Sequence, residues 1–171
     1  SSLLQPGGVA LDLSAIAKGY GADLVARRLR ARAVPAALVE VGGELFGYGR
    51  KPDGTRWRVL IEACAEDAAP VAAAHAPPLR AVVLDGLAVA TSGERWHAFE
   101  HDGMRYAHTL APHSGRALAD APVATTVIAR TAMQADAWAT ALTVMGVETG
   151  LVFAQAHDLA VRFLARDAGR L

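Results

Sequence analysis

Asp136 and Thr140 lie four residues apart in the stretch ADAWAT, which begins an apolar segment expected to be a helix from Ala135 to Met145, ending at Gly146. On a helix this spacing places a carboxylate and a hydroxyl on one face. Such hard oxygen ligands suit Mg²⁺ or Ca²⁺, and Mg²⁺ commonly combines one or two protein carboxylates with substrate phosphates. The alternative is that Asp136 only caps the helix or lies favourably at the positive end of its dipole.

The stretch DLSAIAKGY, from Asp12 to Tyr20, is the second one that could carry chemistry. A helix that begins here would expose unpaired backbone N–H groups able to receive phosphate, and Lys18 would add a cation one turn later. Alternatively, Asp12 or Ser14 caps the helix and Lys18 is solvated. Gly19 costs about 1 kcal/mol relative to Ala inside a helix, so its presence favours close packing or a ligand at that point.

His108 ends a strand-like segment and precedes a loop that contains Pro112 and Gly115. Functional groups often occupy such loops on rigid supports, and an imidazole that titrates near neutral pH can act as a general base. The alternative is an ordinary surface histidine. Three further histidines lie nearby in sequence, but their spacings match no zinc-ligand pattern, so zinc is not expected; these are His97, His101 and His113.

Two glycine-containing segments have small residues where strands should end or continue. Gly42-Gly43 permits either a sharp turn or close approach of the backbone to a bulky group. The segment Ala90-Thr91-Ser92-Gly93 offers hydroxyl groups that could line a pocket or form a plain turn. Neither segment alone decides between these alternatives.

The elements that must position these residues follow from apolar periodicity and turn residues. We expect helices at 14–31, 135–145 and 149–156, and strands at 37–41, 45–49, 57–62, 79–84, 87–91, 96–100, 104–110, 123–130 and 159–164. Turn residues predict a hairpin joining the strands at 45–49 and 57–62, an antiparallel meander over 79–110, and loops at 63–78 and 111–122. The pattern indicates an α+β fold in which helices pack against one mostly antiparallel sheet.

Composition excludes several classes of protein. A chain of 171 residues suits one domain, here 1–171. Its 17 basic and 17 acidic side chains cancel, which argues against a nucleic-acid partner. Cys64 is the only cysteine, so neither an internal disulfide nor a cysteine-based metal cluster can form. The sequence shows no signal-peptide pattern and no apolar run long enough for a transmembrane segment.

Five stretches, taken in order, resemble the ApbE family of FAD:protein FMN transferases. They are DLSAIAKGYGAD, VEVGGELFGYGRKPDGTRWRV, AVATSG, YAHTLAPHSGRAL and ADAWATALTVMG. The resemblance implies a Mg²⁺-dependent enzyme that binds FAD and moves its FMN portion onto a Thr hydroxyl of an acceptor protein, with release of AMP. It also implies a periplasmic location at the inner membrane.

The resemblance assigns roles to seven residues. It implies a metal site formed by the backbone carbonyl of Ala15 with Asp136 and Thr140. It makes His108 the catalytic base. The positions that contact FAD are Asp12, Lys18 and Thr109.

Two features depart from the family pattern. Ala111 stands where the family has an Asp before the proline, and the substantial N-terminal portion that precedes the first motif in the family is expected to be missing from this chain. The alternatives to a transferase are therefore a FAD pyrophosphatase, in which water replaces the Thr hydroxyl, and a flavin-binding or interaction module with weak catalysis. A third alternative is an α+β piece that associates with itself, as a homodimer, through an uncovered apolar face.

Overall fold

The structure is a computed structural model that describes residues 4, 7–8, 11–61, 80–94, 98–119 and 121–165. The helices are α1 (Ser14–Ala31), α2 (Ala132–Met145) and α3 (Val147–Ala156). The strands are β1 (Ala37–Val41), β2 (Glu44–Tyr48), β3 (Trp57–Ile61), β4 (Arg80–Leu84), β5 (Leu87–Ser92), β6 (Ala98–His101), β7 (Met104–Leu110), β8 (Ala117–Ala119), β9 (Ala124–Ala129) and β10 (Ala160–Leu164). The predicted fold class, α+β with mostly antiparallel strands, is confirmed.

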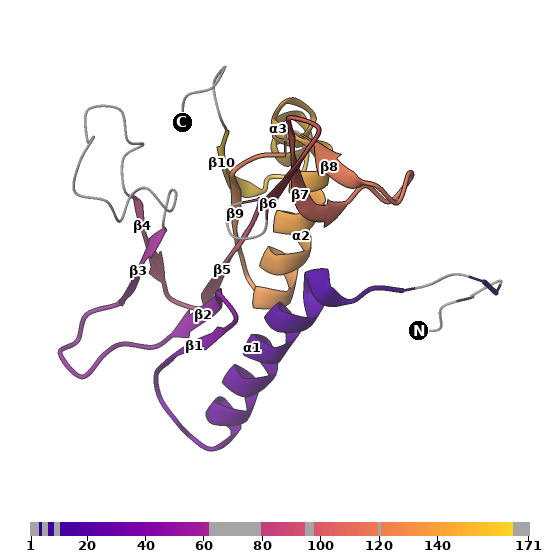
Figure 1. Ribbon diagram of the computed structural model, residues 1–171. Helices are drawn as coiled ribbons and strands as arrows, with labels where there is room; N and C mark the ends of the chain where they lie inside the picture. Colours follow the sequence, from indigo (N-terminus) through magenta and orange to yellow (C-terminus); the bar gives the residue numbers. More distant parts are fainter. Residues whose placement is uncertain are drawn as a thin grey trace.

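The centre of the protein is a five-stranded sheet in the order β1-β2-β5-β9-β10, with every neighbouring pair antiparallel. The three helices lie together on one side of this sheet (Figure 1). Apolar burial between α1, α2 and the sheet forms the main core. Its buried members are Ala22, Ala26, Val39, Phe46, Tyr48, Ala88, Ala90, Val127, Ala132, Ala135, Ala139 and Leu142. No described helix has the length and apolar character needed to cross a bilayer.

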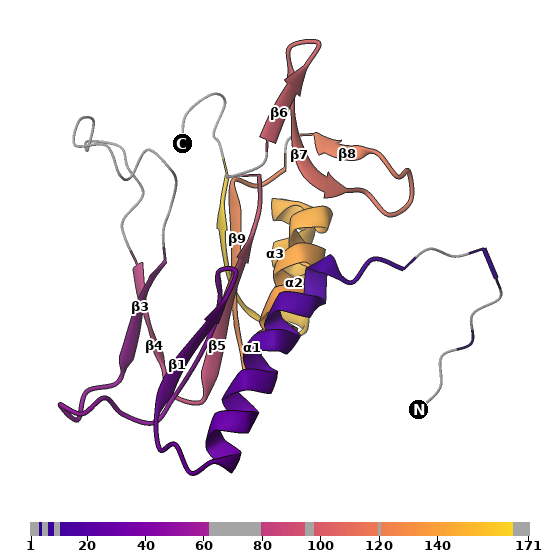
Figure 2. The ribbon, with the colours of Figure 1, turned by 60° about the horizontal axis from the view of Figure 1, so that its bottom comes forward.

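Strands β3 and β4 form a separate two-stranded ribbon, which stands on the side of the main sheet away from the helices (Figure 2). The predicted turn at 51–55 is present and is closed by an antiparallel bridge between Arg50 and Arg56. The predicted pairing of the strands at 45–49 and 57–62 is wrong, because β2 pairs with β1 and β5 instead. The ribbon contacts the main sheet where Leu84 packs over Gly47, since a Cβ at Gly47 would lie 2.6 Å from the Leu84 Cβ. The absence of a side chain at Gly47 lets the two layers approach.

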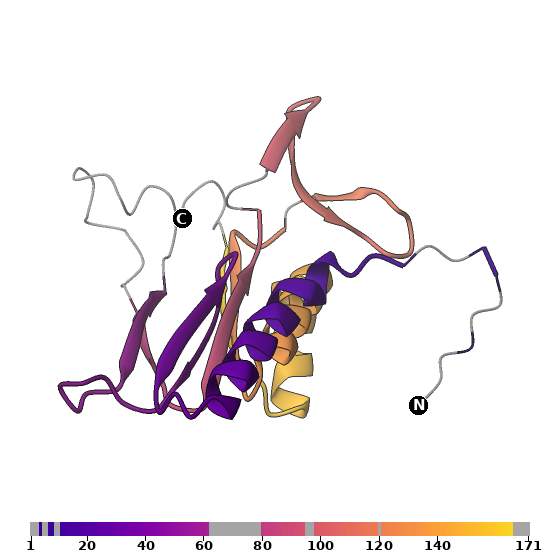
Figure 3. The same cartoon turned by 90° about the horizontal axis from the view of Figure 1, so that it is seen from below.

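Strands β6, β7 and β8 form a third, small sheet, which extends away from the five-stranded sheet (Figure 3). The single predicted meander over 79–110 is thus divided among three sheets. Strand β8 lies inside 111–122, which we expected to be a loop. The strand was missed because three residues are too few to show alternation of apolar and polar side chains. The predicted loop at 63–78 lies outside the described residues.

Helix α2 begins three residues before its predicted start. The Thr131 side chain accepts a hydrogen bond from the Gln134 N–H and caps the helix at its N-terminus. Asp23 of α1 accepts two further hydrogen bonds, from the Ala132 and Met133 N–H groups, at 2.9 and 3.0 Å. Thr131 is a local capping signal that the predicted start did not take into account, whereas the cap from Asp23 of another helix cannot be recognised from local sequence.

Candidate active site

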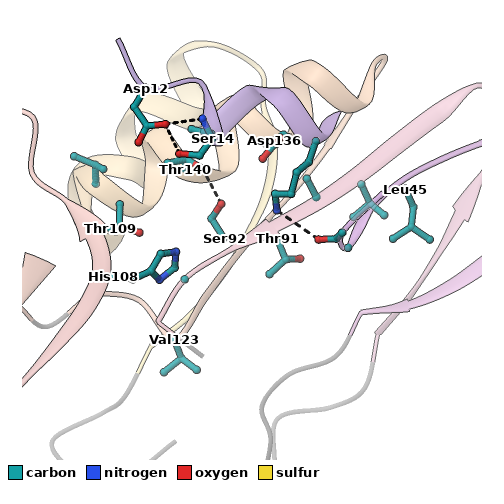
Figure 4. A pocket seen from close by; sticks show the side chains of 18 of the residues that line it. Asp12, Ser14, Leu45, Thr91, Ser92, His108, Thr109, Val123, Asp136 and Thr140 are labelled. Carbon is teal, nitrogen blue, oxygen red and sulfur yellow. Dashed lines mark hydrogen bonds between the residues drawn. The ribbon is translucent and has the colours of Figure 1, made fainter. Parts of the chain in front are cut away.

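A large open cavity of about 1570 Å³ lies among α1, α2, β5, β7 and the β3 ribbon. All seven residues singled out from the sequence line it: Asp12, Ala15, Lys18, His108, Thr109, Asp136 and Thr140. Figure 4 shows His108 and Thr109 on β7, Ser92 on β5, and Asp136 and Thr140 on α2 around this cavity. Residues more than a hundred positions apart in the chain therefore meet at one place.

Asp12 lies just before the N-terminus of α1, and its side chain forms hydrogen bonds with Ser14, the first residue of the helix. Its Oδ1 accepts hydrogen bonds from the backbone N–H of Ser14, at 2.8 Å, and from the Ser14 hydroxyl. These two bonds, the hydroxyl bond first, lower the pKa of the exposed Asp12 carboxyl. The N-cap position of α1 is Leu13 and has no side-chain cap, so Asp12 is not the helix cap: it bonds locally to Ser14, and its side chain lines the cavity.

Asp136 does not cap its own helix, because that position belongs to Thr131. The Asp136 side chain is only 2% exposed, and its Oδ2 accepts a hydrogen bond from the backbone N–H of Gly19 at 3.0 Å. Its other oxygen, Oδ1, accepts no hydrogen bond within the described part of the chain. The carboxylate is therefore held by one oxygen at the junction of α1 and α2.

Gly19 shows why this junction is close. A Cβ at this position would lie 2.3 Å from the Ala132 carbonyl oxygen and 2.5 Å from its carbon, so no side chain fits. Close packing, one of the two explanations expected for this glycine, is therefore observed. The N–H of Gly19 is also the regular helical partner of the Ala15 carbonyl, four residues earlier. The same N–H lies within hydrogen-bonding distance of Asp136, which places the Ala15 carbonyl beside the carboxylate.

Lys18 is not simply solvated. Its Nζ lies 2.6 Å from Glu44 Oε1 and donates a longer bond, 3.4 Å, to the Gly42 carbonyl. Glu44 is 2% exposed, and its Oε2 has no hydrogen-bond partner among the residues that the structure describes. Burial raises the pKa of the Glu44 carboxyl, and the nearby charge of Asp136 adds to this, while Lys18 acts against both.

Sequence reasoning missed Glu44. The available signal was a glutamate placed directly after Gly42-Gly43, at the start of a strand in which it had to be buried. The two glycines form the tight turn between β1 and β2, with φ of +59° and +99°. This turn brings the Gly42 carbonyl and the Glu44 carboxylate to the same ammonium group.

Thr140 meets the end of β5. Its Oγ1 lies 2.9 Å from Ser92 Oγ, and either hydroxyl can donate. Thr91 and Thr126 form a similar hydroxyl pair at 2.9 Å between β5 and β9. The hydroxyl groups of the predicted pocket segment 90–93 thus do line the cavity, and one of them orients Thr140.

His108 and Thr109 are neighbours on β7, yet both line the cavity. In a regular strand adjacent side chains point to opposite faces. Here the pairing of β7 with β8 shifts register between Tyr106 and Leu110. Tyr106 pairs with Ala119 and Leu110 pairs with Ala117, so a step of four residues along β7 matches a step of two along β8. Such irregularities redirect side chains, and this one allows both residues to reach the same space.

Comparison with known proteins agrees with this architecture. The crystal structure of the Pseudomonas stutzeri flavinyl transferase ApbE, in its apo form, superimposes with a TM-score of 0.80 at 42% identity, over 94% of this chain and 47% of that one. The flavin transferase ApbE from Vibrio cholerae gives a TM-score of 0.73 at 36% identity, over 92% and 47% of the two chains. The fold is therefore that of the ApbE flavin transferases.

Sequence comparisons lead to the same family. The family model described as the ApbE family matches residues 1–163. A FAD:protein FMN transferase of Vibrio cholerae is 38% identical over 156 residues, and one of Escherichia coli K12 is 35% identical over 157. These matches cover 91% and 92% of this chain but 45% and 43% of the relatives. The chain belongs to the ApbE family and spans less than half the length of the curated relatives it matches.

Proposed function

We propose that this chain forms the metal-binding and pyrophosphate-binding part of a Mg²⁺-dependent FAD:protein FMN transferase. The observation that carries the proposal is the convergence of residues from α1, β7 and α2 on one cavity large enough for a dinucleotide. Relatives that carry the name FAD:protein FMN transferase support the reaction class. The acceptor would be a protein that presents a Thr hydroxyl, and the second product would be AMP.

The donor atoms fit a hard divalent cation. Asp136 offers Oδ1, Thr140 offers a hydroxyl oriented by Ser92, and Ala15 offers a backbone carbonyl beside the carboxylate. The described residues contain no group of three His, Cys, Asp or Glu side chains that could bind a metal. A set with one carboxylate and two neutral oxygens leaves positions open for substrate phosphate oxygens, which is the usual arrangement for Mg²⁺.

In this proposal a bound Mg²⁺ would neutralise negative charge on the pyrophosphate as its anhydride bond breaks. Lys18 would add positive charge on the same side, and its ion pair with Glu44 keeps the ammonium at the cavity wall. The oxygen of the acceptor Thr would bond to the FMN phosphorus while the bond between that phosphorus and the oxygen of AMP breaks. The neutral imidazole of His108 would take the hydroxyl proton.

Ala111 bears on the two alternatives, a FAD pyrophosphatase and a flavin-binding module with weak catalysis. The loop after β7 closes through its own backbone: the Ala111 carbonyl accepts from the N–H groups of Ser114 and Gly115, and its N–H donates to the Arg116 carbonyl. This loop therefore keeps its shape without an Asp at position 111. The choice between transferase, pyrophosphatase and binding module therefore rests on the products of the assay below. Periplasmic location at the inner membrane and homodimer formation stay predictions.

The test is to incubate the chain with FAD, Mg²⁺ and an acceptor peptide containing Thr, and to measure AMP together with covalently bound flavin. We expect both products in equal amounts. Asp136→Ala should abolish them, and His108→Ala should reduce the rate by about 10²- to 10⁴-fold, the usual contribution of a general base. His101→Ala, an exposed histidine on β6 of the same small sheet, is the matched control and should have no effect.

The products distinguish the candidates. AMP and free FMN without flavinylated peptide would favour the pyrophosphatase. Saturable FAD binding with no AMP would favour the binding module. Flavin transfer that survives Asp136→Ala would contradict the assignment of the metal site.

A further inference from the structure

A partly buried ion pair joins the small sheet to the main sheet. Arg105 Nε lies 3.2 Å from Glu94 Oε1, and the Glu94 side chain is 1% exposed while that of Arg105 is 41% exposed. Glu94 lies two residues beyond the end of β5, and Arg105 is the second residue of β7. The pair therefore connects the end of a central strand to the strand that carries His108.

The carboxylate end of this pair has a rigid support. The Glu94 N–H donates to the Pro122 carbonyl at 3.4 Å. Next to it, Gly93 lies so close to the following segment that a Cβ would be 2.3 Å from the Val123 carbonyl oxygen. The position of Glu94 is thus fixed by backbone packing at the edge of the cavity.

The arginine end of the pair belongs to the small sheet of β6, β7 and β8. Ala107 is fully buried, and β7 contacts α2. On the outer side, Phe99 is half exposed and stacks on Tyr106 with ring centroids 5.5 Å apart. Within the described part of the chain, the contact around Ala107 and the Glu94–Arg105 pair both attach the small sheet to the rest of the protein.

We propose that Glu94 and Arg105 are positioning residues that hold His108 at its working distance from Asp136 and Thr140. The inference rests on the proposed function, in which His108 is the base and α2 carries metal ligands. Arg105 is three residues from His108 on the same strand, so a rotation of the sheet about α2 moves the imidazole directly. Removing the guanidinium breaks the contact between β7 and the segment that follows β5, which loosens the attachment of the small sheet at this point.

The test uses Arg105→Met, Glu94→Gln and the conservative Arg105→Lys in the full chain. Hydrogen exchange followed by mass spectrometry should show faster exchange at 98–119 in the first two variants, with α1 and α2 unchanged. In the transfer assay kcat should fall by about 10- to 100-fold, as expected for displacement by about 1 Å, while KM for FAD stays within about twofold. Arg105→Lys keeps the charge and should recover part of kcat.

Arg116→Met is the matched control, because Arg116 is an exposed arginine beside β8 of the same sheet. It should change neither exchange nor kcat. Unchanged exchange at 98–119 in Arg105→Met and Glu94→Gln would overturn the positioning role, and so would a loss confined to KM for FAD. If the wild-type chain transfers no flavin, the proposed function fails, while the exchange measurement still decides whether the pair holds the small sheet.

Discussion

The backbone N–H of Gly19 in α1 donates to Oδ2 of Asp136 in α2 at 3.0 Å, at the point where the two helices come closest. One residue therefore sets the spacing of the helices and fixes the carboxylate that we assign to the metal. The same contact explains why a glycine occupies the interior of a helix despite its conformational cost.

Gly19→Ala should destabilise the protein strongly. The added methyl would lie 2.3 Å from the Ala132 carbonyl oxygen, which is backbone and cannot rotate away. Overpacking of this kind costs about 1–3 kcal/mol or more, measurable by urea unfolding. Gly21→Ala is the matched control in the same helix, because its Cβ would meet only Val41 Cγ1, at an ordinary 3.7 Å. That change should stabilise by about 0.5–1 kcal/mol, and equal destabilisation by both variants would contradict the packing argument.

Asp23→Ala should weaken the start of α2 although the residue lies in α1. The substitution removes the acceptor of the Ala132 and Met133 N–H groups, both at a buried helix end. Loss of a cap costs about 0.5–2 kcal/mol. Hydrogen exchange should accelerate at 132–136 before it does at the C-terminal end of α2. Asp23→Asn keeps one acceptor and should lie between the wild type and Asp23→Ala; an effect confined to α1 would be evidence against this cap.

Glu44→Gln should change how stability depends on pH. Burial raises the pKa of the folded carboxyl above its ordinary value of 4.5, so between these two values the folded state binds more protons than the unfolded state. This contribution to stability is full below pH 4.5 and is lost as pH rises through the folded pKa. The free energy of unfolding of the wild type, relative to Glu44→Gln, should therefore fall over that window and then level off.

Lys18→Met provides the companion variant for this pH experiment. It removes the cation that opposes the raised pKa, so the fall in stability should extend to higher pH than in the wild type. Urea unfolding over a pH series, in buffer with chelator, measures both variants. If the difference in free energy of unfolding between wild type and Glu44→Gln stays constant across the pH series, folding does not raise the pKa of Glu44.

Thr140→Val removes the hydroxyl group of Thr140 while keeping the size and branching of the side chain. It removes the bond to Ser92, worth about 1 kcal/mol, and also removes a proposed metal ligand. Mg²⁺-dependent FAD binding, followed by flavin fluorescence, should be lost in Thr140→Val and retained in Thr140→Ser. Thr126→Val on β9 is the control, since it breaks the comparable hydroxyl pair with Thr91 of β5. A similar loss of Mg²⁺ dependence in both valine variants would point to general destabilisation.

Much of the local structure could be predicted from the sequence, because it depends on local signals. Helix α1 has its predicted bounds, and β1, β7 and α3 agree within two residues. What could not be predicted is the pairing of strands: Asp-Gly turns locate strand ends but do not say which strand lies beside which. The hairpin of β3 and β4 and the separate small sheet arise from tertiary packing, such as the Leu84 contact over Gly47.

In the candidate site, too, some residues could be predicted from the sequence and others could not. The motif stretches and their order pointed to seven residues, all of which line the cavity. Glu44, Asp23 and Glu94 were missed because each acts across a gap in sequence of 11 residues or more, on Lys18, on the first turn of α2, and on Arg105. Their partners become visible only when the chain is folded. The role of each of the seven lining residues stays a prediction until the variants are measured.

The contact between Gly19 and Asp136 also limits how this site can vary. A larger residue at position 19 would move α2 outward and pull the carboxylate away from its donor, and a shift of the carboxylate would require the helices to separate. The distance between α1 and α2 and the direction of the Asp136 carboxylate therefore cannot change independently of each other. To fit a larger cation at the proposed metal site, an engineer would have to redesign two helices together.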